Sequence, residues 1–262
     1  MDEADDRGPA SGPKALSSIE LARLSGKIWL NTSIAISNGV CFTAEGYPNS
    51  AEALAIHIQR PQFPELLRRF LYDQLNLNAA ISANNIPLDQ CPVVVGWIHI
   101  FHSAVARFFA PSDLCGAGGM HCERIRSNSN WQDKGARNDT VFVQTGSDDG
   151  SMKGMAIGRV CLLFSFVSSG VCYPRAMIEW FTTDDEIDDE TGMWVVRPEF
   201  KGVHGCATAI IHLDWIARAA HLIPVFGSLF VPEELHYSNS LDVYHAYFVN
   251  NYVDHHSHKF LS

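Results

Sequence analysis

The stretch RVCLLFSFVSSGVCYPRAMIEWFT, residues 159–182, decides the predicted fold. Two runs rich in β-branched and aromatic residues flank the short turn signal Ser168-Ser169-Gly170, and together they predict a β-hairpin. Further strand-like runs lie at residues 93–101, 141–143, 193–197 and 209–213. Several short strands joined by tight turns predict a small curled β-sheet or barrel.

Helices are expected before and after this sheet. Apolar residues recur at helical spacing from Phe63 to Leu75, and Pro64 is tolerated in a first turn, so this segment is predicted to be an amphipathic helix. A second helix is expected from Ser240, as its N-cap, to about Asp254. The predicted fold class is therefore α+β, with a disordered tail over residues 1–18, a helical segment over 19–90, and a β-rich module with a C-terminal helix over 91–262.

Two segments are predicted to be loops. Residues 111–140 lack periodicity and collect Gly, Ser, Asn and Asp, which is typical of a long irregular loop. The run 184–190 contains six acidic residues, and we expect it to be exposed between strands because so many charges cannot be buried without partners.

The formal net charge of −10 belongs mainly to two places. Four acids lie in the first six residues and six in the run 184–190, and the rest of the chain has as many basic as acidic residues. A broad basic surface that collects phosphates is therefore excluded, and any contact with DNA must be local.

Several classes of protein are disfavoured by composition. The seven cysteines include no CxxC pair, which favours reduced thiols in an intracellular chain over a disulfide framework. The N-terminus lacks the basic and apolar regions of a secretory signal, and no apolar run is long enough to cross a membrane. No glycine-rich loop is followed by Lys-Ser/Thr, so we expect no bound nucleotide and no other cofactor.

Six strings of residues, in order along the chain, resemble the C-terminal region of Plavaka-type proteins of fungal DNA transposons, which are related to the CACTA transposases. The strings are APSDLCG at 110–116, GGM at 118–120, ERIRS at 123–127, TGMWVV at 191–196, HLIPV at 221–225 and YVDHH at 252–256. The similarity runs from about Phe63 to the C-terminus. In that family the nuclease core with its acid triad lies upstream, so the resemblance implies a non-catalytic, nuclear chain that contacts DNA or the catalytic part of a transposase.

The candidate residues for DNA contact lie in the predicted loop 111–140. Arginine and lysine pair with phosphates, and tryptophan stacks on unpaired bases. Three acidic residues lie among the candidates, so the alternative is a set of internal ion pairs that pin the loop over the barrel. The candidates are Arg124, Arg126, Trp131, Lys134 and Arg137.

The strand pattern around 179–181 and 193–197 also resembles SH3-like barrels, including the bromo-adjacent-homology (BAH) domain. Such barrels often bind proteins, so the alternative function is a stand-alone protein-interaction or chromatin-reading module. Its aromatic groove would be lined by Tyr173, Trp180, Phe181 and Trp194. For the two tryptophans we expect burial in the sheet to dominate.

The chain has one candidate metal pair and no identifiable catalytic set. Asp254 and His258 have the i, i+4 spacing of helical metal ligands, although a surface or capping role is the alternative. The acids of the run 184–190 are consecutive and point apart, so they do not predict a metal-dependent nuclease centre. We therefore predict no catalytic residues and no enzyme activity in this chain.

Overall fold

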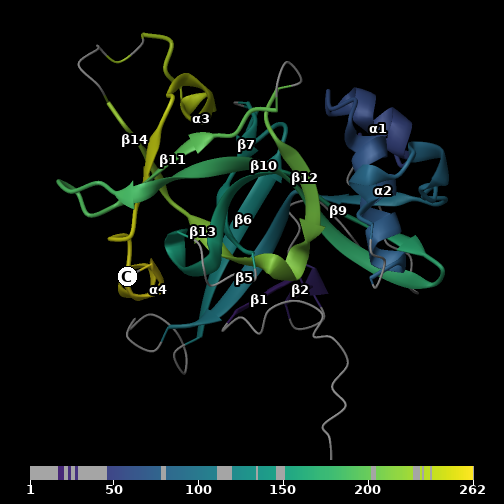
Figure 1. Cartoon of the computed structure of the whole chain (residues 1–262), viewed down its shortest axis with the longest axis horizontal. Coiled ribbons are helices and arrows are strands. Elements are labelled where there is room, and N and C mark those ends of the chain that lie inside the picture. Colours follow the sequence, from purple (N-terminus) through teal and green to yellow (C-terminus); the bar gives the residue numbers. More distant parts are fainter. Residues whose placement is uncertain are drawn as a thin grey trace, which may run out of the picture.

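The computed structural model describes residues 17–20, 23–24, 27–28, 46–77, 81–110, 120–133, 135–145, 151–201, 205–226, 231, 233–236 and 238–261. Within these residues the chain is a mixture of helix and sheet in which strands predominate (Figure 1). Residues 1–16 of the predicted tail lie outside this part. No helix in the described ranges is long and apolar enough to cross a membrane.

The body of the protein is a nearly closed, barrel-like sheet. Within the described residues it has nine strands, and each neighbouring pair is antiparallel. Seven of them follow in the order β13 (Ile216–Ala220), β8 (Thr140–Gln144), β9 (Met155–Ser168), β10 (Val171–Ile187), β11 (Trp194–Pro198), β15 (Tyr247–Val249) and β14 (Leu222–Pro224). The other two are β12 (Thr208–His212), which pairs with β10, and β4 (Ile98–Phe101), which pairs with β9.

A second antiparallel sheet lies against the first. It consists of β1 (Ser17–Glu20), β5 (Ser103–Phe109), β6 (Met120–Asn128) and β7 (Arg137–Asn138), and β2 (Arg23–Leu24) pairs separately with β3 (Lys27–Ile28). Strand β13 contacts β1, β5 and β6, and β6 contacts β9. The second sheet therefore covers one side of the barrel.

Helices α1 and α2 lie together on one side of the sheet, near β12 and β9, whereas α4 lies at the C-terminus and α3 lies apart from it beside β14 (Figure 1). Their bounds are α1 (Ala51–His57), α2 (Phe63–Leu75), α3 (Ser240–Val243) and α4 (His255–Leu261). Short 3-10 turns lie at η1 (Ala83–Asn85), η2 (Leu88–Gln90), η4 (Ser151–Gly154) and η6 (Leu213–Trp215).

The predicted hairpin is confirmed as β9 and β10, whose register begins with Ser168 opposite Val171. The two turn residues have positive φ, 50° at Ser169 and 78° at Gly170. A two-residue hairpin turn of this kind matches the right-handed twist of its strands. The segment quoted above thus forms the centre of the main sheet.

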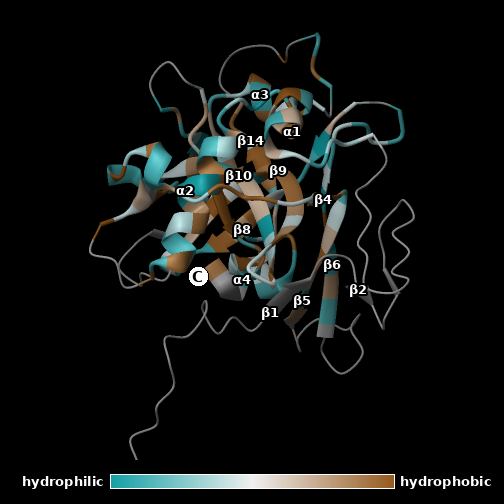
Figure 2. Ribbon diagram, turned by 90° about the vertical axis from the view of Figure 1, so that its right-hand side faces the viewer, coloured by the Kyte–Doolittle hydropathy of each residue, from teal (hydrophilic) through white to brown (hydrophobic). Residues whose placement is uncertain are grey.

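A β-bulge at Cys161 decides which side chains of β9 point into the barrel, because Cys161 is an extra residue between two partner pairs of β9 and β10. As a result Val160 and Leu163 belong to one cluster between the sheets although they are three residues apart. Leu162 and Phe164 belong to a second cluster under α1 and α2. Figure 2 shows the hydrophobic residues concentrated along β8, β9 and β10.

The predicted amphipathic helix is confirmed as α2. Its buried residues are Phe63, Leu67 and Leu71, and the Phe63 ring meets Phe164 of β9 edge-on at 5.3 Å. The third hydrophobic cluster lies at the other end of the sheet, under β15 and α4, and includes Phe181. Both faces of the β9–β10 hairpin are therefore buried, and each hydrophobic cluster covers a different stretch of the two strands.

The predicted helix from Ser240 to Asp254 is wrong. Helix α3 ends at Val243, and the chain then forms β15 before α4 begins at His255. The apolar residues of β15 pair with both β11 and β14. Segments rich in β-branched and aromatic residues favour strands over helices, and here the two ladders supply the backbone hydrogen bonds that a strand needs. A C-terminal helix is present, but it is α4.

Two predicted loops are shorter than expected. Residues 120–128 form β6, in which Ile125 is fully buried while the charged residues on either side have partners elsewhere in the fold. In the acidic run, β10 continues to Ile187, and the turn that follows is held by Asp188, whose carboxylate accepts from the Thr191 backbone at 2.8 Å.

Two other predicted segments differ from the structure. The strand predicted for 93–101 begins only at Ile98. In the expected helical segment 19–90, α-helix is limited within the described residues to α1 and α2, and strands β1–β3 lie in or at the start of it.

The dependence of the fold on the β9–α2 contact is testable. We expect Phe164→Ala to lower the free energy of unfolding by about 3–5 kcal/mol, because this fully buried ring fills the space between β9 and α2. Phe200→Ala is the matched control, since the Phe200 side chain is 66% exposed. Urea unfolding followed by circular dichroism measures both, and equal midpoints for the two variants would contradict the packing described.

Candidate functional site

Four of the five residues predicted to contact DNA are brought together by the β6–β7 hairpin. Arg124 and Arg126 flank the buried Ile125 on β6, so both point away from the barrel interior. Asn128 at the end of β6 pairs with Arg137 of β7. Trp131 lies in the connection, where its backbone N–H donates to the Gly135 carbonyl at 2.8 Å. Lys134, the fifth candidate, lies outside the described residues.

The indole of Trp131 orients two of these arginines. The guanidinium carbon of Arg126 lies 5.0 Å from the centre of the ring, and that of Arg137 lies 5.4 Å from it. Planar guanidinium groups stack favourably on aromatic faces, which limits the conformations that the long side chains can adopt. This geometry favours a role for Trp131 in positioning cations over the predicted role in stacking on a base.

One carboxylate serves both stacked arginines. Asp139 accepts from the Nε of Arg137 at 3.0 Å and from the backbone N–H of Arg126 at 2.9 Å, and it lies 4.0 Å from the Arg126 guanidinium. Internal ion pairs are therefore present, as the alternative predicted. Burial, followed by the positive charges of Arg137 and Arg124, lowers the pKa of Arg126 despite the opposing effect of Asp139. The cluster thus concentrates positive charge.

The clustered arginines line a cavity of about 700 Å³. This volume is within the range of small-ligand sites, roughly 300–1,000 Å³. Its walls come from β6, β7, β9, the β13–β14 connection and the start of α3. The charged residues that line it are Glu123, Arg124, Arg126, Arg137, Asp139 and Arg159.

Arg159 is the pocket residue that sequence reasoning missed. It comes from β9, and its guanidinium binds the Asp242 carboxylate of α3 at 2.5 and 3.3 Å. The sequence feature that could have identified Arg159 is its position as an arginine within an otherwise apolar predicted strand. Such a residue must meet a partner or a polar cavity, because an unpaired buried charge is strongly unfavourable.

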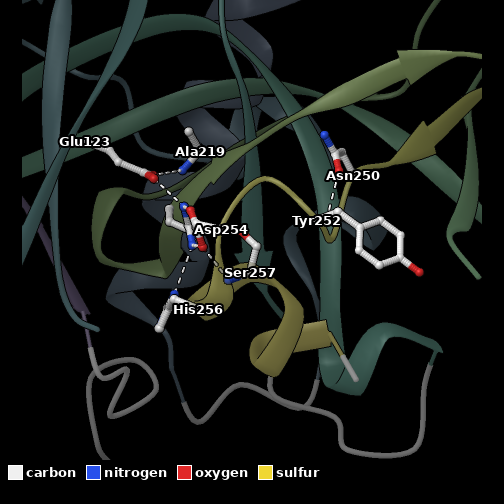
Figure 3. Close-up of polar contacts among 8 residues, drawn as sticks. Glu123, Ala219, Asn250, Tyr252, Asp254, His256 and Ser257 are labelled. Carbon is white, nitrogen blue, oxygen red and sulfur yellow. Dashed lines mark hydrogen bonds and ion pairs between the residues drawn. The ribbon is translucent and has the colours of Figure 1, made fainter. Parts of the chain in front are cut away.

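The second acid of the pocket, Glu123, has two partners on β13, of which Ala219 is labelled in Figure 3. Arg218 of β13 is only 1% exposed and forms an ion pair with Glu123. The other Glu123 oxygen accepts from the Ala219 backbone at 3.1 Å. Arg218 also donates to Asp254 at 2.6 and 3.0 Å and to the Nδ1 of His256 at 3.0 Å. This network connects the pocket floor to α4.

Asp254, the first residue of the predicted metal pair with His258, already has partners within the protein. Asp254 caps α4, because its carboxylate accepts from the Ser257 backbone at 2.6 Å and also binds Arg218. Burial alone would raise the pKa of Asp254, but the hydrogen bonds from Arg218 and Ser257 outweigh it and hold the pKa well below its usual range. Within the described residues no group of three or more His, Cys, Asp and Glu side chains could hold a metal ion.

The aromatic candidates of the alternative function do not line one groove. Tyr173 packs against the cluster under α1 and α2, and Trp180 packs against the barrel interior. Phe181 and Trp194 belong to the cluster under β15. Successive residues of a strand point to opposite faces, which separates Trp180 from its neighbour Phe181. Both tryptophans are half-buried and contribute to packing.

The ion pair under the pocket predicts a dependence of stability on pH. A carboxyl group with a depressed pKa stabilises the fold fully above its unfolded pKa of about 4, and this stabilisation is lost as the pH falls toward the folded pKa. We therefore expect Asp254→Asn to cost about 1.5–3 kcal/mol at pH 7 and progressively less below pH 4. Urea unfolding at pH 7 and pH 3, with Asp189→Asn in an exposed turn as the control, measures this difference. A deficit that is the same at both pH values would contradict the assignment.

No family model matches the chain, and no curated protein or solved structure is significantly similar to it. Its function is therefore inferred from the geometry of the pocket and from the residues that carry the resemblance to Plavaka-type proteins.

Proposed function

We propose that this chain is a non-catalytic, DNA-contacting region of a transposon-derived protein, and that the arginine pocket binds the phosphodiester backbone. The observation that carries the proposal is the pair Arg126 and Arg137, which stack on one indole and share the single carboxylate Asp139. A phosphate is the ligand that such a pair fits best, because a guanidinium presents several N–H donors in a plane that matches phosphate oxygens.

The pocket is also prepared electrostatically for an anion. The positive charges of Arg137 and Arg124 act with burial to lower the pKa of Arg126, so an incoming phosphate relieves repulsion that already exists. The free energy of binding would come from charge-assisted hydrogen bonds between the phosphate and the arginines of the pocket.

The resemblance to Plavaka-type proteins agrees with this location. The string at 123–127 supplies Arg124 and Arg126, and the string at 221–225 supplies His221 and Leu222 of the pocket wall. The string at 252–256 includes Asp254, which holds Arg218 beneath the pocket. We propose that the catalytic part of the transposase lies elsewhere and that this region acts beside it on DNA in the nucleus.

A chromatin-reading or peptide-binding role is the weaker proposal. The barrel-like sheet agrees in general form with an SH3-like or BAH-like barrel, but fold alone does not imply function. A reader of this kind needs aromatic side chains that face one groove. In this fold the four candidates belong to three different clusters.

The proposal predicts weak, salt-sensitive binding of DNA. We expect Arg126→Gln or Arg137→Gln to reduce the affinity for a fluorescein-labelled 20-mer single strand about tenfold, because each change removes charge-assisted hydrogen bonds to phosphate. Fluorescence anisotropy over 50–200 mM NaCl should also show a smaller slope of log K against log salt, by roughly 0.7 for each phosphate that the variant no longer neutralises.

The matched control is Arg197→Gln. Arg197 is a half-exposed arginine of β11 that forms an ion pair with Asp184 and does not line the pocket. Its substitution should leave both the affinity and the salt slope unchanged. An equal reduction of affinity in all three variants would show that net charge, rather than the pocket, determines binding, and no binding by the unchanged protein would end the proposal.

A further inference from the structure

A second cavity of about 340 Å³ adjoins the arginine pocket. Both cavities are lined by Ala136 and Asn138, so the two share a wall. They are also connected through β9, where Arg159 lines the first cavity and Cys161 lines the second. Because they share lining residues, the two cavities are close enough to take neighbouring parts of one ligand.

The second cavity differs from the first in its charge. Its one cation, within the part of the chain that the structure describes, is Arg60, which binds the Glu179 carboxylate at 2.6 Å. Burial, together with Glu179, raises the pKa of the Cys161 thiol to about 12, so this side chain is uncharged at neutral pH. A cavity whose cation is already paired does not favour a phosphate group.

The remaining walls suit a flat, polar ring. The Tyr47 ring is fixed by a 2.8 Å hydrogen bond between its hydroxyl and Ser129 and by an edge contact with His57 at 4.9 Å. Leu162 and Met177 line the cavity with apolar surface. Aromatic and apolar walls of this kind stabilise a nucleobase through its ring face.

Hydrogen-bonding groups for the edge of a base are present as well. Gln59, Asn138 and Ser127 are among the residues that line the cavity. The Ser127 hydroxyl donates to the Asn138 carboxamide oxygen at 3.4 Å, which leaves the carboxamide NH2 group of Asn138 and the Gln59 carboxamide for a ligand. A carboxamide offers a donor and an acceptor side by side, which is the arrangement that pairs with the edges of bases. In a duplex these edges and ring faces are covered by pairing and stacking.

We propose that the second cavity is a nucleobase subsite, which takes an unpaired base from a strand whose phosphate lies in the arginine pocket. This inference rests on the proposed function, since it assigns the ligand of the neighbouring cavity. The substrate class is then single-stranded or locally unpaired nucleic acid. An intact duplex cannot place a base in the cavity without unpairing it, which costs a few kcal/mol.

The test compares two labelled 20-mers of equal charge, one of deoxyadenosine and one made entirely of abasic sugar phosphates, by fluorescence anisotropy. We expect the full-length protein to bind the deoxyadenosine strand about tenfold more tightly, in line with the effect of one buried base. Tyr47→Ala and Gln59→Ala should remove this preference while leaving the affinity for the abasic strand unchanged. Gln59 is exposed, so its substitution does not put folding at risk.

The control is Tyr252→Ala, a 62% exposed tyrosine that lines neither cavity. Equal affinity for the two strands, reduced for both by Arg126→Gln, would overturn the subsite and leave the phosphate pocket in place. A preference for the base that survives in both Tyr47→Ala and Gln59→Ala would also overturn it. If neither strand binds, the proposed function itself fails.

Discussion

The burial of both faces of the β9–β10 hairpin is the constraint on which the rest of the structure depends. A strand that is apolar on both sides must be covered on both sides, and a single layer of structure cannot do so. The second sheet covers one face, whereas α1, α2 and the C-terminal elements cover the ends of the other. The bulge at Cys161 divides the strand between these coverings. Arg159 and Cys161, between the two ends, line the cavities.

The buried Arg218 is the second constraint, because a charge in an apolar setting must be paired. Glu123 and Asp254 both form ion pairs with it, and the Phe108 ring lies 4.6 Å from its guanidinium carbon. Truncating either acid leaves this buried cation with one carboxylate instead of two, so the network connects β6, β13 and α4 more specifically than apolar contacts would. Because Glu123 forms an ion pair with Arg218, it neutralises the pocket arginines less, and these arginines outnumber the acidic residues that line the pocket.

Local patterns predicted part of the fold, and they grouped several residues of the candidate site. The hairpin and α2 follow from residues that are close in sequence and bury one continuous pattern. Strand β6 was missed because its charged residues find partners far along the chain, as Glu123 does with Arg218. Strand β15 was missed because it is stabilised by two ladders to distant strands. Long-range pairing of this kind leaves no periodic signal in the segment itself.

In the candidate site, the composition of the sequence could group four residues, because they all lie within positions 124–137: Arg124, Arg126, Trp131 and Arg137. Composition could not show that Arg159 of β9 lines the same pocket. The aromatic candidates lie in different clusters because alternation along β10 turns Trp180 and Phe181 to opposite faces, and because Tyr173 lies at the other end of that strand from Phe181.

An acidic chain can hold a site for anions because electrostatic effects in water are short-ranged. At physiological salt the Debye length is about 8 Å, so exposed charges beyond that distance contribute little to the field in a pocket. In the part of the chain that the structure describes, no residue of the run 184–190 lines the arginine cavity. Part of that run is held within β10 and by the turn at Asp188. The arginines on Trp131, rather than the net charge of −10, therefore set the potential in the pocket where we propose that a phosphate binds.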